Sequence, residues 1–174
     1  MPTLPLPRWV RVLSSVSRSD PAHVDVALSI GKPSETSNDL ANMSCVAVDG
    51  RAVLFRGRSG SGKSTLCLEI MALGGDLVCD DGVVLTKRDE QVIVACPQAL
   101  KGRIEARGVG IIAAQAAGAA RLALVVDLDK TATKRLPERQ FCHVMGISLP
   151  LIHKVEGPHF AAVIVQLLKG GLAG

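Results

Sequence analysis

The residues best suited to chemistry form one glycine-rich segment, Gly57-Arg58-Ser59-Gly60-Ser61-Gly62-Lys63-Ser64. It is a complete G-x-x-x-x-G-K-[ST] phosphate-binding pattern, here called the P-loop. Its glycines let successive backbone N–H groups turn towards phosphate oxygens. The lysine reaches the β- and γ-phosphates, and the serine hydroxyl binds Mg²⁺. The P-loop and the adjoining Thr65 therefore predict a site for a nucleoside triphosphate.

Two flanking segments must hold this loop in position. Val53-Leu54-Phe55 before it is typical of a buried strand, and residues 64–73 after it are typical of a helix. This order of strand, loop and helix separates a working P-loop from a chance match. Asp49-Gly50, between two apolar runs, also predicts a hairpin that leads into the loop.

Short strands outnumber helices in the rest of the chain. We expect strands at residues 77–79, 122–126 and near 151–152, a second hairpin over residues 83–95, and an amphipathic C-terminal helix over residues 158–168 with Ala162, Val165 and Leu168 facing inward. The pattern predicts an α/β fold with a mixed sheet. The chain has 174 residues, enough for one domain. Residues 1–40, rich in proline and serine, are expected to form a poorly ordered or loosely attached arm.

Composition narrows the function classes. The net charge of +4 is interspersed and aromatic residues make up only 2% of the chain, so we expect no nucleic-acid partner. No signal segment or membrane-length apolar run is present, which predicts a cytoplasmic protein without a membrane partner. The five cysteines form no C-x-x-C pair and are odd in number, which predicts small buried residues in a reducing compartment.

Two acidic sites compete for the task of ordering a metal ion. Asp80-Asp81 follows the strand after the P-loop helix, and Asp127 follows the apolar run Leu124-Val125-Val126. The hydrophobic pattern alone does not separate them. Adjacent carboxylates repel each other unless a metal or cation offsets their charge, so the pair Asp80-Asp81 is a candidate site for a metal ion or other cation. A solvated Asp-Asp-Gly turn would also fit.

Three segments together resemble the catalytic domain of bacterial HPr kinase/phosphorylase, in the short form that lacks an N-terminal domain. They are residues 57–64, residues 77–81 and, most specifically, Ile104-Glu105-Ala106-Arg107-Gly108-Val109-Gly110-Ile111. The resemblance covers roughly residues 42–168. It implies a P-loop kinase domain over residues 41–174, with a fold akin to phosphoenolpyruvate carboxykinase. It also implies an ATP- and Mg²⁺-dependent serine kinase of the phosphocarrier protein HPr, acting in phosphotransferase-system regulation as a homo-oligomer.

The same resemblance implies roles for residues in nucleotide and metal binding. Lys63 would contact the β- and γ-phosphates, while Ser64 and Glu105 would hold Mg²⁺. Asp80 would support the metal or couple electrostatically to Asp81. Arg107 would organise its own loop.

Transfer itself would use Asp81 as proton acceptor for the target serine and Arg135 near the transferring phosphate. Asn42 occupies a position where the family usually has histidine. Because asparagine can hydrogen-bond a phosphate but cannot exchange a proton near neutral pH, we expect weaker transfer rather than none. The family segment tied to phosphorolysis has no match at residues 155–159, so phosphorolysis activity is doubtful. The alternative is an ATP-binding regulatory or sensor module with weak or no transfer.

Overall fold

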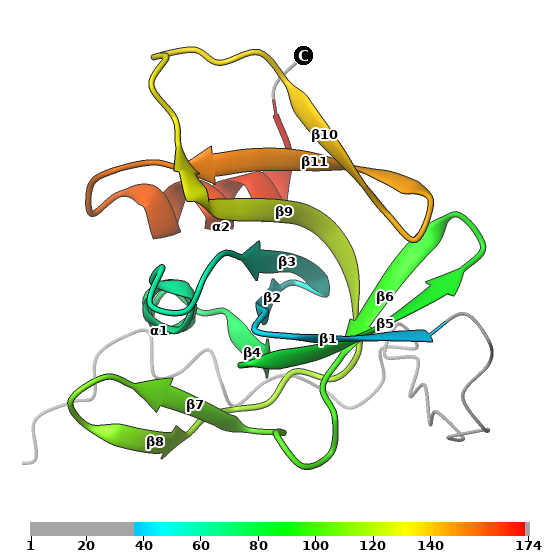
Figure 1. The fold of residues 1–174 in the computed structure, drawn as a ribbon, viewed down its shortest axis with the longest axis vertical. Coiled ribbons are helices and arrows are strands. Elements are labelled where there is room, and N and C mark those ends of the chain that lie inside the picture. Colours follow the sequence, from blue (N-terminus) through cyan, green and yellow to red (C-terminus); the bar gives the residue numbers. More distant parts are fainter. Residues whose placement is uncertain (1–36, 173–174) are drawn as a thin grey trace, which may run out of the picture. The chain divides into compact units, whose positions relative to one another are not determined.

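The computed structural model describes residues 37–172, and these form one nine-stranded sheet, a separate hairpin and two helices (Figure 1). Most of the sheet follows the order β1-β5-β6-β9-β3-β2-β4, and β11 pairs with β9 and with β10. Its strands are β1 (Ser37–Ala41), β2 (Ser44–Val48), β3 (Arg51–Arg56), β4 (Asp76–Cys79), β5 (Gly82–Arg88), β6 (Gln91–Ala95), β9 (Ala120–Thr131), β10 (Gln140–Val144) and β11 (Ile147–Lys154). The hairpin consists of β7 (Arg103–Ala106) and β8 (Gly110–Ala113), and the helices are α1 (Lys63–Ala72) and α2 (Phe160–Gly170).

Both hairpins expected from local sequence are present. β2 and β3 are antiparallel, and Asp49 and Gly50 between them have φ values of 50° and 73°. Positive φ at both central residues matches the twist of the flanking strands, which is why Asp-Gly favours this turn. β5 and β6 form the second hairpin, with Asp89 at φ 50° in its turn. The α/β class, the mixed sheet and the two helices are confirmed.

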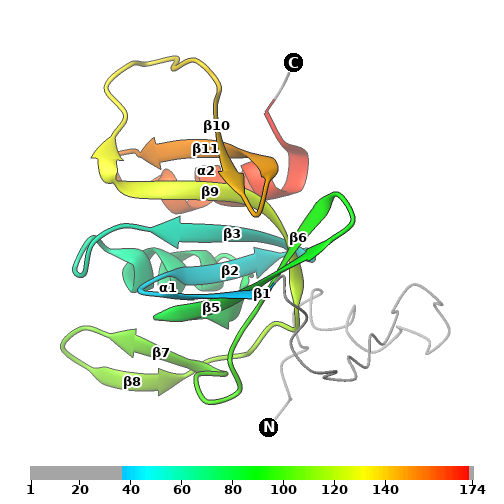
Figure 2. The ribbon, with the colours of Figure 1, turned by 45° about the vertical axis from the view of Figure 1, so that its right-hand side comes forward.

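Parallel strands define the edge of the sheet where the P-loop lies. β3 runs parallel to β9, and β9 runs parallel to β11, so the carboxyl ends of all three meet on the same side (Figure 2). The P-loop follows the end of β3. The register between β3 and β9 places Arg56 beside Asp127. In α/β sheets ligands bind outside the carboxyl ends of the strands, so a ligand site is expected at this edge.

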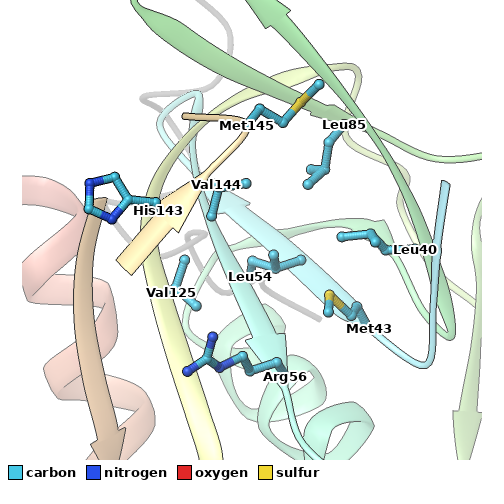
Figure 3. A pocket seen from close by; sticks show the side chains of 9 residues that line it. All are labelled: Leu40, Met43, Leu54, Arg56, Leu85, Val125, His143, Val144 and Met145. Carbon is cyan, nitrogen blue, oxygen red and sulfur yellow. The ribbon is translucent and has the colours of Figure 1, made fainter. Parts of the chain in front are cut away.

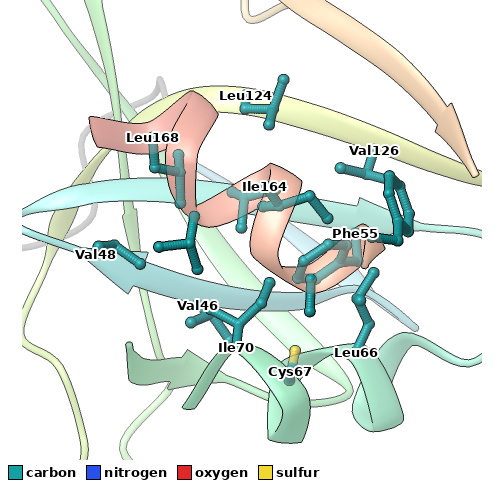
Figure 4. Packing of buried hydrophobic residues seen from close by; sticks show 14 of the residues in the cluster. Val46, Val48, Phe55, Leu66, Cys67, Ile70, Leu124, Val126, Ile164 and Leu168 are labelled. Atoms are coloured by element: carbon teal, nitrogen blue, oxygen red, sulfur yellow. The ribbon is translucent and has the colours of Figure 1, made fainter. Parts of the chain in front are cut away.

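The helices cover one face of the sheet. Phe55 and Val126 from β3 and β9 pack against Ile70 of α1 and Ile164 of α2, all of them buried (Figure 4). A second cluster, including Leu54 and residues of β5 and β6, fills the opposite face. Because side chains alternate along a strand, each central strand contributes to both clusters. This packing fixes α1 and therefore the P-loop at its start.

Several expectations need correction. β1 begins at Ser37, so residues 37–40 belong to the sheet rather than to the predicted arm; the rest of that arm lies outside the described residues. The inward face of α2 consists of Phe160, Ala161, Ile164, Val165 and Leu168, whereas Ala162 is exposed. The prediction is confirmed for Val165 and Leu168 and is wrong for Ala162.

The cysteine prediction holds for only part of the set. Cys45 and Cys67 are buried, and burial raises the pKa of both thiols, with the charge of Asp80 adding to the effect at Cys67. Cys79 and Cys96, however, form a disulfide between the ends of β4 and β6, with Cα atoms 5.0 Å apart. β4 and β6 are not hydrogen-bonded neighbours in the sheet, so neither spacing along the chain nor a strand-pairing pattern reveals this contact.

Candidate nucleotide-binding site

The P-loop has the backbone geometry of a phosphate cradle. Gly57 has φ 150°, and a Cβ there would lie 2.8 Å from Ser61 Oγ, so only glycine fits. Gly62, at φ 98°, is the residue before α1, and neither a capping side chain nor an acidic residue occupies the first turn of that helix. A helix N-terminus with such free N–H groups attracts anions. Ser61 Oγ is buried and has no hydrogen-bond partner among residues 37–172, which leaves a further polar group in the loop.

Lys63 lies across the mouth of this loop. Its side chain is buried, and its Nζ donates hydrogen bonds to the carbonyl oxygens of Gly57 at 2.8 Å and Arg58 at 3.0 Å. An ammonium group has three N–H donors, so a third can be directed at a phosphate oxygen. The sequence-predicted lysine is therefore positioned within the cradle. Ser59 and Thr65 are exposed on the same segment.

Asp80 joins four parts of the site. Its carboxylate accepts hydrogen bonds from Ser44 Oγ of β2 at 2.6 Å and from Ser64 Oγ at the start of α1 at 2.9 Å. It also accepts one from the backbone N–H of Glu105 in β7 at 3.1 Å. Asp80 is buried although it carries a charge, and such a group needs this degree of compensation. It thus connects β2, the end of β4, the P-loop helix and the β7–β8 hairpin.

Asp127 has a different environment from Asp80. Its carboxylate accepts hydrogen bonds from Arg56 Nε at 3.2 Å and Nη2 at 2.9 Å. Burial alone would raise its pKa, but the hydrogen bonds from Arg56 and the Asp129 backbone N–H, with the charges of Arg56 and Lys130, hold the pKa of Asp127 below its usual value. Of the two acidic candidates left open by the sequence, Asp80 is the one that lies beside the P-loop serine.

Asp81 and Asn42 meet at the same edge. The backbone N–H of Asn42 donates to the carbonyl oxygen of Asp81 at 3.3 Å, and the adjacent β1–β5 register pairs Ala41 with Gly82. Both residues have left-handed backbone conformations, with φ of 64° for Asp81 and 57° for Asn42, and both are exposed. Asp and Asn tolerate this conformation better than most residues. The structure therefore brings together two residues that are 39 positions apart in the printed sequence.

The β7–β8 hairpin lies against the P-loop. The Glu105 side chain is exposed while its backbone is tied to Asp80. A Cβ built on Gly60 would lie 3.8 Å from Arg107 Nη2, so the guanidinium reaches the loop. Arg135 is not brought into this group: it lies in the exposed segment between β9 and β10, and no described residue forms a hydrogen bond or ion pair with it.

The oxygen atoms at this site suit Mg²⁺ better than they suit a metal ion that is coordinated by protein side chains alone. Among residues 37–172 no group of three His, Cys, Asp or Glu side chains is placed to hold a metal ion. Mg²⁺ usually takes one or two carboxylates and completes its shell with water and phosphate oxygens. Asp80, Ser64 and the nearby Glu105 fit that requirement.

Two residues of this site were missed by the sequence reasoning. Ser44 is buried, and its hydrogen bond to Asp80 is the shortest that this carboxylate accepts from the described residues. Asp129 accepts hydrogen bonds from the P-loop backbone N–H of Arg58 at 3.0 and 3.2 Å. The only sequence signal for Asp129 was its spacing of two residues from Asp127, which puts both side chains on one face of β9.

A separate cavity of about 240 Å³ lies on the sheet face opposite the helices (Figure 3). It is mostly apolar, and its lining residues are Leu40, Met43, Leu54, Arg56, Leu85, Val125, His143, Val144 and Met145. Arg56 at its margin also forms the ion pair with Asp127. None of the residues predicted for nucleotide or metal binding lines this cavity.

Comparison with known proteins identifies the class of domain that carries this P-loop and acidic pair. The family model "HPr Serine kinase C-terminal domain" matches residues 36–152. The chain therefore belongs to the HPr serine kinase C-terminal domain family.

The names of individual relatives agree with this family assignment. The chain is 32% identical over 136 residues to a protein named HPr kinase/phosphorylase from Caldicellulosiruptor bescii, and 38% identical over 136 residues to one from Geobacillus thermodenitrificans; each match covers 70% of this chain and 44% of the relative. The chain thus spans less than half the length of these relatives. A solved structure titled "Structure of the Hpr(Ser) kinase/phosphatase from Coxiella burnetii" has the same fold, with a TM-score of 0.62, 24% identity, and coverage of 76% of this chain and 94% of that one. In the described part of the chain, neither helix is long and apolar enough to span a membrane.

Proposed function

We propose that this chain is an ATP- and Mg²⁺-dependent kinase domain, of the P-loop type akin to phosphoenolpyruvate carboxykinase, that phosphorylates a serine of HPr. One observation carries the proposal: the P-loop serine Ser64 is hydrogen-bonded to Asp80, directly beside the exposed Asp81. A phosphate cradle, a carboxylate for the metal and a second carboxylate for the acceptor are the parts that phosphoryl transfer requires. The names of the relatives support HPr as the acceptor.

In this mechanism the P-loop N–H groups and Lys63 bind the triphosphate and neutralise its charge. Ser64, Glu105 and Asp80 would hold Mg²⁺, and the bound ion would offset phosphate charge. Asp81 accepts the proton of the attacking serine hydroxyl from its exposed position at the end of β4. Arg135, on the segment after β9, approaches the transferring phosphate when substrates are bound.

Binding is tested first, because it precedes transfer. Lys63→Ala removes the ammonium group from the cradle and should weaken ATP binding by roughly 1.5–3 kcal/mol, the usual contribution of hydrogen bonds to charged groups. Isothermal titration with ATP and Mg²⁺ measures the change. Equal affinity of parent and variant would reject the assigned role of Lys63.

Transfer is tested with γ-labelled ATP and purified HPr, either wild type or with its acceptor serine changed to alanine. We expect label on wild-type HPr alone, and only with Mg²⁺ present. Absence of label at every Mg²⁺ concentration would refute the kinase assignment. Because it acts on a phosphocarrier protein, the enzyme is expected in the cytoplasm. It is also expected to form a homo-oligomer, and light scattering on the purified chain measures its molar mass.

Asn42 supports one alternative, an ATP-binding sensor module with weak or no transfer. Its backbone lies against Asp81, where a histidine could exchange protons with the reacting groups. Restoring histidine by Asn42→His discriminates the two functions. A silent parent that gains transfer on this change is a sensor, whereas a parent that is already active is a kinase. Phosphorolysis is not part of the proposal, because residues 155–159 do not match the family segment tied to it.

A further inference from the structure

One peptide unit of the P-loop, between Gly57 and Arg58, is held from both sides. Its carbonyl oxygen accepts a hydrogen bond from Lys63 Nζ at 2.8 Å. Its N–H donates to both carboxylate oxygens of Asp129, at 3.0 and 3.2 Å. The orientation of this peptide therefore depends on a cation from α1 and an anion from β9.

The backbone of Asp129 is itself fixed by a neighbour. The backbone N–H of Asp129 donates to Asp127 Oδ1 at 3.0 Å, and the other oxygen of Asp127 is paired with Arg56. The parallel ladder between β3 and β9 ends at Arg56 and Asp127. The contact between Asp129 and Arg58 continues the attachment beyond the ladder, into the P-loop itself.

We propose that Asp129 is a positioning residue for triphosphate binding, a role that rests on the proposed function. By holding the N–H of Arg58, it turns the carbonyl of Gly57 towards Lys63 and keeps the ammonium group across the mouth of the loop. The carboxylate does not contact the phosphates, whose negative charge it would repel. Its contribution is the geometry of the loop.

Charge and geometry can be separated at this position. Asp129→Asn keeps an acceptor oxygen for the Arg58 N–H but removes the negative charge, while Asp129→Ala removes both. Asp89→Asn is a matched control, because Asp89 is an exposed residue in the β5–β6 turn, and asparagine also tolerates its φ of 50°. Thermal unfolding checks that each variant is folded.

The Kd for ATP with Mg²⁺ is the first measurement. A side chain that accepts a hydrogen bond from a backbone N–H outside regular secondary structure resembles a helix N-cap. Removing an N-cap costs about 1 kcal/mol, or about fivefold in an equilibrium constant. We expect Asp129→Ala to raise Kd by about fivefold, and Asp129→Asn and Asp89→Asn to stay within about twofold of the parent. If Asp129 had only a structural role, the variants would differ in unfolding temperature, but their Kd values for ATP would not differ in this way. Parent-like affinity of Asp129→Ala, or equal weakening of the alanine and asparagine variants, would overturn the proposal.

The second measurement needs no nucleotide. Amide hydrogen exchange at Arg58, followed by NMR in the free protein, should be several-fold faster in Asp129→Ala than in the parent and in Asp129→Asn. Unchanged exchange in Asp129→Ala would overturn the proposal even if the parent binds ATP. If the parent binds no ATP, the proposed function fails, while this exchange rate still decides whether Asp129 holds the loop.

Discussion

The hydrogen bond between Ser44 and Asp80 gives the sharpest test of the site's architecture. Ser44 is 1% exposed and Asp80 is 6% exposed, and their oxygens are 2.6 Å apart. Changing Ser44 to alanine removes a charge-assisted hydrogen bond from a buried carboxylate, which leaves Asp80 with Ser64 and the Glu105 N–H. Such a bond contributes about 1.5–3 kcal/mol, so Ser44→Ala should lower the free energy of unfolding by about that amount.

This loss is measurable as a change in thermal stability. For a chain of this size about 1 kcal/mol corresponds to about 2–4 °C in Tm, so the expected fall is about 3–12 °C. Ser148→Ala in β11 is the control, because Ser148 is exposed and should change Tm by no more than about 2 °C. Differential scanning calorimetry of both variants decides the matter. A Tm of Ser44→Ala equal to that of Ser148→Ala would refute the inferred coupling of β2 to Asp80.

Three further predictions concern the ion pair, the loop glycine and the disulfide. The pKa of Asp127 is lowered in the folded state, so the ionised carboxylate stabilises the fold above about pH 4, and this stabilisation is lost as the pH falls through the folded pKa. The free energies of urea unfolding of the parent and of Asp127→Asn should therefore converge below about pH 4. A difference in free energy that does not change with pH would contradict this. Gly57→Ala forces a Cβ against a neighbouring hydroxyl and should cost about 1–3 kcal/mol, whereas Gly118→Ala has open space and should cost little; equal Tm values for the two would refute the strain. A thiol titration of the denatured, unreduced protein should find three free cysteines, since Cys79 is paired with Cys96, and five would show that the bond does not form.

Local signals predicted the parts of the fold that local sequence determines. The Asp49-Gly50 turn specified the β2–β3 hairpin because both residues accept positive φ, and the glycine spacing of the P-loop specified the start of α1. These features need only a few neighbouring residues. They could therefore be predicted without knowledge of the sheet order.

Features that depend on strand order could not be predicted in the same way. Asp80 and Asp127 both follow apolar runs in the sequence, and only the structure shows that Asp80 reaches Ser64 while Asp127 is paired with Arg56. The contact between Asp129 and Arg58 joins residues 71 positions apart. Sequence periodicity reports which face a side chain occupies but not which strand lies beside it.

The proton-acceptor role of Asp81 is the central claim, and single-turnover phosphoryl transfer to HPr tests it most directly. The parent should transfer phosphate from ATP to the HPr serine, and Asp81→Asn should be slower by at least about 10²-fold with unchanged affinity for ATP, since general-base catalysis typically contributes about 10²–10⁴ in rate. Transfer by Asp81→Asn at the parent's rate would contradict the account.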